Sequence, residues 1–159
     1  MPMSQARRMN LIALAFAVTA LVVFVAFHFL PWSPLWKGWV VWEDIFGDLA
    51  DGGLEEPPLV LAAASLLTES LLIVLLPFLL RMTWSSRLLW WTVTLVSGIA
   101  TCALAGIILY FILLDPYTRA EAGPAVYCLV AAPVLNFISL LFVRREAPEP
   151  HAFPSPESH

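Results

Sequence analysis

The chain has 159 residues, of which 60% are hydrophobic and 13% are charged, and its formal net charge is -4. With so few polar side chains it cannot coat a soluble globule, and it has no basic cluster of the kind that binds nucleic acid. The composition therefore predicts an integral membrane protein whose first partner is the lipid bilayer.

Four long apolar segments cover most of the chain, at residues 11–30, 59–80, 88–114 and 125–143. About 20 helical residues at a rise of 1.5 Å cross the roughly 30 Å hydrocarbon core, so each segment is long enough to span it. The segments do not alternate apolar and polar residues as membrane strands do. We predict an all-α membrane protein, with four transmembrane helices in an antiparallel bundle that forms one domain over residues 1–143.

The first span follows two basic residues, Arg7 and Arg8, as a signal peptide would. Its apolar stretch is longer than the roughly 7 to 15 residues of a signal-peptide core, and it lacks a small-x-small cleavage site. We expect an uncleaved membrane anchor.

The loop between the first two spans contains an amphipathic segment at about residues 33–51. One helical stripe carries Leu35, Trp39, Trp42, Phe46 and Leu49, and the opposite side carries Lys37, Asp44, Asp48 and Asp51. Ser33-Pro34 is a typical helix start. We predict a short interfacial helix that places Trp39, Trp42 and Phe46 at the membrane interface, with an irregular loop bearing interfacial tryptophans as the alternative.

Glu69 lies about midway along the second span, where a charged side chain costs on the order of 3 kcal/mol on insertion scales. Counting depth along the predicted helices places Asn136, Thr101 and Thr19 near the same level, and Ser65 precedes Glu69 by four residues on the same helix face. We predict a polar layer across the bundle. It could relay protons or ions or bind a polar substrate, or it could simply join the helices by hydrogen bonds.

In the third span, Gly98, Cys102 and Gly106 form a ridge of small residues at steps of four. Such ridges allow close approach of helices, so we predict a helix-packing role for these three positions. Cys102 and Cys128 differ in depth by roughly 12 Å, more than the Cα separation of about 7 Å that a disulfide tolerates, so both should be unpaired.

Orientation follows from the basic residues. Six of them lie before the first span, in the second loop or after the fourth span, whereas two lie in the first and third loops: Arg7, Arg8, Arg81, Arg87, Arg144 and Arg145 against Lys37 and Arg119. The positive-inside rule places both termini in the cytoplasm, and we expect the plasma (inner) membrane. Residues 144–159 contain four prolines and no apolar period, which predicts a disordered cytoplasmic tail.

The sequence lacks a nucleophile elbow, a P-loop and an HExxH motif, and His28 is the sole histidine within a span. We therefore expect no enzymatic activity, no cofactor and no metal. The favoured interpretation is a protein that acts by association, as an accessory or assembly subunit of a larger membrane complex or by self-association. The alternative is a small proton, ion or solute transporter that uses Glu69.

Overall fold

The computed structural model describes residues 4–51, 57–114 and 116–144. These residues form six helices: α1 (Gln5–Phe29), α2 (Val40–Asp51), α3 (Pro57–Ser85), α4 (Arg87–Leu114), α5 (Pro116–Glu121) and α6 (Pro124–Phe142). Helices α1, α3, α4 and α6 are long and apolar enough to cross a membrane. The predicted all-α fold with four spans is confirmed, and the chain is a multi-pass membrane protein. The predicted tail lies outside the described residues from position 145 onward.

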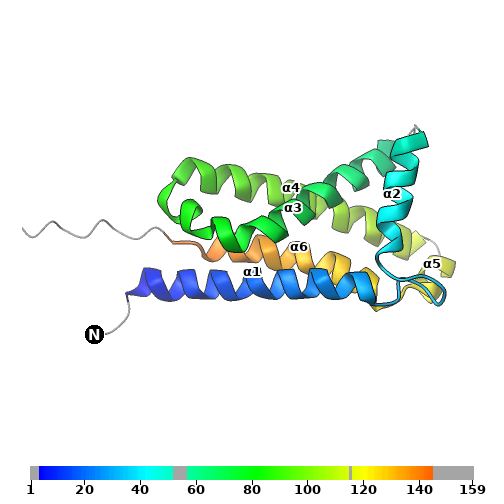
Figure 1. Cartoon of the computed structure of the whole chain (residues 1–159), viewed down its shortest axis with the longest axis horizontal. Helices are drawn as coiled ribbons and strands as arrows, with labels where there is room; N and C mark the ends of the chain where they lie inside the picture. Colours follow the sequence, from blue (N-terminus) through cyan, green and yellow to red (C-terminus); the bar gives the residue numbers. More distant parts are fainter. Residues whose placement is uncertain (1–3, 52–56, 115, 145–159) are drawn as a thin grey trace, which may run out of the picture.

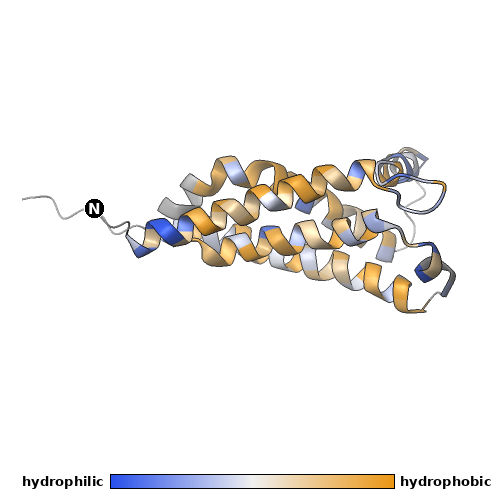
Figure 2. Ribbon diagram, turned by 90° about the horizontal axis from the view of Figure 1, so that it is seen from below, coloured by the Kyte–Doolittle hydropathy of each residue, from blue (hydrophilic) through white to orange (hydrophobic). Residues whose placement is uncertain are grey.

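The four long helices form an antiparallel bundle (Figure 1). Helix α1 packs against α6 and α3, and α4 packs against α3 and α6, so the helices close into a ring. Apolar residues cover the length of the bundle, and hydrophilic residues gather at its two ends (Figure 2). We call these ends the N-terminal end, where α1 begins, and the α2 end, where α2 and α5 lie.

The tightest pair is α1 with α6, and small side chains make it possible. Ala13, Ala17 and Ala20 form the buried stripe of α1, and Ala132 is equally buried on α6. Without a hydrophobic force between helices in lipid, dispersion contacts between closely spaced backbones hold such a pair together. Helix α1 begins before the predicted span because the Ser4 hydroxyl accepts a hydrogen bond from the Arg7 amide (3.2 Å) and caps the first turn.

The third predicted loop contains the short helix α5, which the sequence analysis did not anticipate. Arg119 on this helix donates from Nε and Nη2 to the carbonyl oxygens of Ile112 and Leu113, both at 3.1 Å. Those carbonyls belong to the last turn of α4, where no intrahelical donor remains. Arg119 therefore caps α4 and holds the loop against it.

Helix α2 lies across the end of the bundle, but it begins at Val40 and not near Ser33 as predicted (Figure 1). The preceding residues fold into a tight turn in which the Trp36 amide donates to the Ser33 carbonyl (3.3 Å) and Pro31 bridges Lys37. Gly38 packs directly against the carbonyl group of Phe27, where a side chain would collide. These contacts with the end of α1 replace the first helical turns expected from the periodicity alone.

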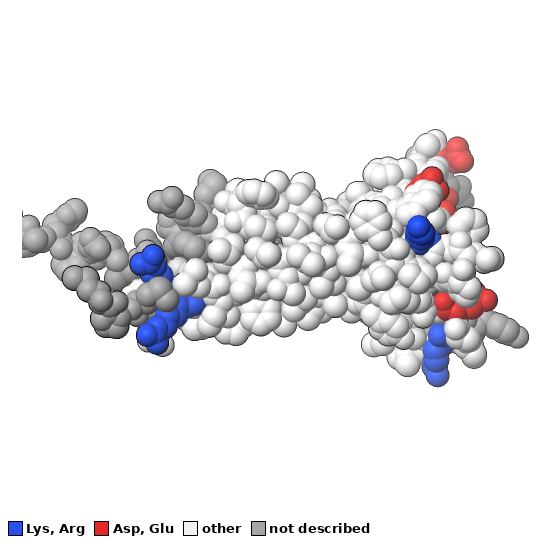
Figure 3. Space-filling model, turned by 60° about the horizontal axis from the view of Figure 1, so that its bottom comes forward, with Lys and Arg blue, Asp and Glu red and all other residues white. Residues whose placement is uncertain are grey.

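On the face shown in Figure 3, charged side chains lie at the ends of the bundle. Arg7, Arg8 and Arg144 lie at the N-terminal end, and the described acids of α2 and α5 lie at the other end together with Lys37 and Arg119. The long middle of the face shown carries neither sign. This distribution matches the need to keep exposed charge out of the hydrocarbon region.

Candidate functional site

Glu69 of α3 is fully buried, at 0% exposure, and it is the one ionisable side chain in the buried core of the described residues. The sequence prediction that it faces protein and not lipid is therefore met by its geometry. Lipid offers a carboxyl group no hydrogen-bond partner, so a buried position among other helices is what makes its insertion tolerable.

Two neighbouring helices supply donors to the carboxyl group. Thr101 Oγ1 of α4 donates to Glu69 Oε1 at 3.1 Å, and Asn136 Nδ2 of α6 donates to Glu69 Oε2 at 3.4 Å. The Thr101 hydroxyl also lies 3.5 Å from the Pro133 carbonyl oxygen. Depth counting named both partners correctly, and we call Glu69, Thr101 and Asn136 the midplane cluster.

The other predicted members of the polar layer differ in placement. Ser65 is 5% exposed and lies one turn from Glu69 on α3. Thr19 is exposed, and its hydroxyl donates to the Ala15 carbonyl of its own helix at 2.8 Å, so its inclusion in the layer was wrong. Its depth was suitable, but its direction around the axis of α1 turns it toward lipid.

Further buried polar side chains escaped the sequence analysis: Asn10, Thr94, Ser97 and Ser139. Ser97 faces the Glu69 carboxyl group, although its hydroxyl lies outside hydrogen-bonding geometry. On α4, Thr94, Ser97 and Thr101 recur at steps of three and four, a polar stripe that could have been found by looking for periodicity among hydroxyl residues as well as among apolar ones.

The small-residue ridge of α4 does not pack within this chain as a unit. A Cβ atom on Gly98 would lie 3.0 Å from a ring carbon of Phe137, so Gly98 does admit α6. Cys102 is exposed, and no described atom outside the nearby backbone of α4 lies within 4 Å of a Cβ placed on Gly106. These two positions therefore do not pack against another helix of the described residues. Cys102 and Cys128 are both unpaired, as predicted.

The aromatic residues of α2 are divided between the bundle and the surface. Trp42 donates from Nε1 to His28 Nε2 at 2.9 Å, and its ring stacks on the imidazole with centroids 6.1 Å apart. His28 Nδ1 lies 2.8 Å from the Phe24 carbonyl, so the ring proton sits on Nδ1 and leaves Nε2 free to accept. Trp39 and Phe46 are 45% and 55% exposed, and their predicted membrane contact stays a prediction.

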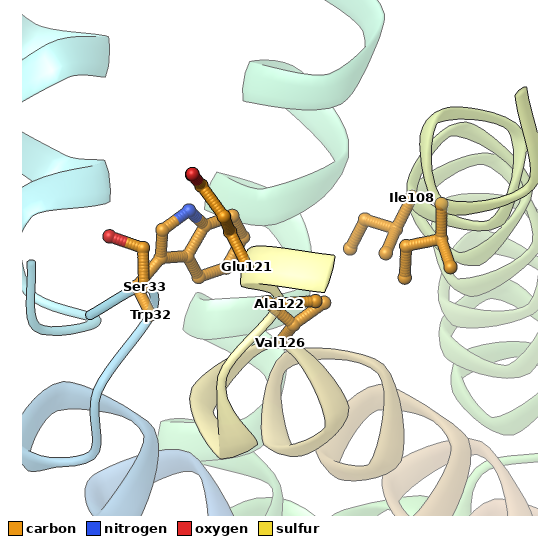
Figure 4. Close-up of a pocket in the computed structure, with 7 residues that line it drawn as sticks. Trp32, Ser33, Ile108, Glu121, Ala122 and Val126 are labelled. Atoms are coloured by element: carbon orange, nitrogen blue, oxygen red, sulfur yellow. The ribbon is translucent and has the colours of Figure 1, made fainter. Parts of the chain in front are cut away.

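Two cavities of about 270 Å³ each open at the α2 end, on either side of Trp32 and Ile108. Figure 4 shows the first, with Glu121 and Trp32 on one side of it and Ile108 on the other. The second is bounded toward the bundle by Leu66, Leu104 and Leu129, each 3% exposed. Neither cavity is lined by Glu69, and the three leucines separate the second cavity from the midplane cluster.

The chemistry available at the midplane cluster is proton binding and hydrogen bonding. Among the described residues no group of three His, Cys, Asp or Glu side chains could hold a metal ion.

Comparison with known proteins identifies no family for this chain: no family model matches it, and neither a curated protein nor a solved structure resembles it significantly.

Proposed function

We propose that this membrane protein acts by association, as an accessory or assembly subunit that docks a transmembrane helix of another chain, or of a second copy, on the outer face of α4. The observation that carries this proposal is the position of Cys102 and Gly106, which lie on one side of α4 and are not covered by any helix in the described part of the chain.

The chemistry of that face supports the assignment. A glycine and a cysteine leave the helix backbone accessible, and close backbone approach is the main source of dispersion energy between helices in lipid. Leu95, Ile99 and Leu109 flank the small residues and are 58%, 70% and 56% exposed. A partner helix could therefore pack on the small residues, between these larger apolar side chains.

The native Cys102 thiol gives a direct test. A benzophenone maleimide attached to Cys102 in a Cys128→Ser background, then activated by light in native membranes, should form an adduct with the neighbouring helix. An adduct at twice the 17.6 kDa chain mass would identify self-association, and a different mass would identify another subunit. Unchanged monomer throughout would contradict the proposal.

Gly106→Leu should reduce this adduct about tenfold, as expected if the added side chain weakens association by about 1.4 kcal/mol. The matched control is Ala15→Leu, which adds bulk at an exposed position of α1 and should leave the adduct unchanged. Both variants should keep the monomer folded because neither position packs within the core. An adduct that persists in Gly106→Leu would place the interface elsewhere.

A second candidate function is transport of protons, ions or a small solute that uses Glu69. One observation favours it: the buried Glu69 carboxyl group accepts hydrogen bonds from Thr101 of α4 and Asn136 of α6. These donors could stabilise the carboxylate when Glu69 releases its proton. A purely structural role, in which Glu69 only joins the helices, relies on the same hydrogen bonds. Substitutions of Glu69 distinguish the structural role from transport.

We also propose that both termini face the cytoplasm and that the α2 end faces outward. The support is the charge distribution, with all described arginines except Arg119 at the N-terminal end and the exposed acids concentrated at the other.

A further inference from the structure

Five buried side chains carry polar atoms with no hydrogen-bond partner in the described part of the protein. The unpartnered atoms are Asn10 Nδ2, Thr94 Oγ1, Ser97 Oγ, Asn136 Oδ1 and Ser139 Oγ. Their residues are at most 7% exposed, so surrounding solvent or lipid headgroups do not reach them. Buried polar groups in native proteins are nearly always paired, and buried water is the usual partner when protein supplies none.

These residues follow one another along the bundle. Asn10 marks the N-terminal end, where its Oδ1 accepts from the Arg144 amide at 2.8 Å. One level further in, Trp90 Nε1 donates to the Leu140 carbonyl at 2.8 Å, beside Ser139 in sequence. The next level is the midplane cluster, where Asn136 reaches Glu69.

The remaining two unpartnered atoms, those of Thr94 and Ser97, belong to helix α4. Thr94 and Ser97 lie between Trp90, which contacts α6 near the N-terminal end, and Thr101, which contacts Glu69. From Thr94 to Thr101 the helix rises about 10 Å, a distance that three or four hydrogen-bonded waters cover. By their positions along the helices, the unpartnered atoms thus fall between the N-terminal end and the carboxyl group.

Apolar core clusters lie on both sides of Glu69, but toward the α2 end no buried polar side-chain atom of the described residues lacks a partner. Phe24, Leu66, Leu104 and Leu129 are at most 7% exposed and belong to one core cluster toward the α2 end. On that side the described residues contribute a single buried polar side chain, Ser65, one turn away. A water chain would find no partners beyond it.

We propose that Asn10, Ser139, Asn136, Thr94 and Ser97 hold a chain of water molecules, and that through it Glu69 exchanges its proton with the N-terminal side of the membrane alone. A proton would pass from water to water and onto a Glu69 carboxylate oxygen, and would leave by the same route, so no other bond changes. This inference does not rest on the proposed association, and it gives direction to the second candidate function.

No other ionisable group complicates this exchange among the described neighbours. The buried polar residues that face Glu69 are Thr101 and Ser97 from α4 and Asn136 from α6. Beyond Asn10, the buried face of α1 carries alanine and phenylalanine. Protonation of Glu69 should therefore follow the proton activity of the side with which it exchanges.

The first experiment uses dicyclohexylcarbodiimide, a membrane-soluble reagent that adds to a protonated carboxyl group and leaves a stable acylurea. The full chain is reconstituted into vesicles, those with the N terminus outside are captured by a terminal tag, and the pH is set separately on each side. Labelling of the Glu69 peptide is measured by mass spectrometry, with Glu69→Gln as the unlabelled control.

We expect the labelling rate to change by up to about tenfold per pH unit on the N-terminal side and to be unaffected by the pH on the α2 side. Labelling that follows the α2 side, follows both sides equally or ignores pH on both sides would overturn the proposal.

The second experiment interrupts the path with an isosteric change. Thr94→Val removes one hydroxyl, and the exchange of the Glu69 carboxyl proton for deuterium, followed by the shift of its infrared band, should slow about tenfold, corresponding to roughly one lost hydrogen bond. Thr19→Val is the matched control, because Thr19 is exposed and bonded to its own helix, and it should exchange at the original rate. Equal rates in both variants would contradict the proposal, because Thr94 is one of the residues that hold the water chain.

Discussion

At the residue scale, the carboxyl group of Glu69 is tied to α4 and α6 by Thr101 and Asn136. A buried donor that loses its acceptor costs about 1–3 kcal/mol in proteins, although hydrogen bonds between membrane helices have averaged about 0.6 kcal/mol. The contribution of the midplane cluster to the free energy of unfolding should therefore lie between these two values, and substitutions can measure it.

Glu69→Gln should unfold at nearly the wild-type denaturant concentration, because its amide oxygen can accept from Thr101 and its amide nitrogen can donate to Asn136 Oδ1 once the Asn136 amide turns over. Glu69→Leu should lower the free energy of unfolding by about 1–3 kcal/mol, because Asn136 Nδ2 loses its acceptor and the Thr101 hydroxyl keeps only the Pro133 carbonyl oxygen at 3.5 Å. Ser70→Ala is the neighbouring control, since the Ser70 hydroxyl bonds within α3 to Leu66, and it should change little.

The same two Glu69 variants separate the functions. If Glu69 relays protons, both should abolish proton flux into vesicles while Glu69→Gln remains folded. If its role is structural, Glu69→Gln should behave as wild type in every assay. Wild-type stability and activity in both variants would remove Glu69 from either account.

At the element scale, helix α2 is attached to the bundle by a small number of contacts. Val41, Trp42 and Ile45 pack on the core, and Trp42 adds the hydrogen bond to His28. The acids Asp44 and Asp48 are exposed, so the amphipathic pattern predicted for this segment does describe its solvent side. Because α2 contacts the bundle mainly through one row of apolar side chains and the Trp42–His28 hydrogen bond, it should unfold locally more easily than the spans.

Trp42→Phe should therefore raise the amide hydrogen exchange of residues 40–51 about fivefold, the factor for a loss of roughly 1 kcal/mol, while exchange in α1 and α6 stays the same. Phenylalanine keeps an aromatic ring at this position but removes the N–H donor together with part of the indole's apolar area, so the measured change combines the bond to His28 with some lost packing. Trp39→Phe, at a position 45% exposed, serves as the control and should leave the exchange rates of α2 unaltered. Equal protection in all three proteins would mean that the bond contributes nothing to docking.

At the scale of the whole molecule, segregated charge gives the bundle a direction. Arginines at one end and acids at the other favour a single orientation during insertion, because translocating arginine or lysine is opposed more strongly than translocating acids. The proposed proton path opens at the N-terminal end, where most of the arginines lie.

The orientation can be checked with single cysteines in a protein lacking Cys102 and Cys128. An impermeant maleimide added to intact cells should modify Asp48→Cys and spare Ser155→Cys until the membrane is permeabilised. Asp48 is exposed on α2, and Ser155 belongs to the sequence-predicted tail outside the described residues. The opposite labelling pattern would reverse the proposed topology.

The spans and the need for a partner at Glu69 could be read from the sequence, because bilayer thickness fixes helix length and hydrocarbon cannot satisfy a carboxyl group. Depth along each helix was equally accessible, which is why Thr101 and Asn136 were found. Rotation about each helix axis was decided only by tertiary packing: Thr19 and Thr101 have similar depth, yet one faces lipid and the other Glu69. Lipid and protein interior are both apolar, so hydropathy cannot distinguish the two faces, and the ridge of Gly98, Cys102 and Gly106 was assigned to packing without indicating which chain would cover it.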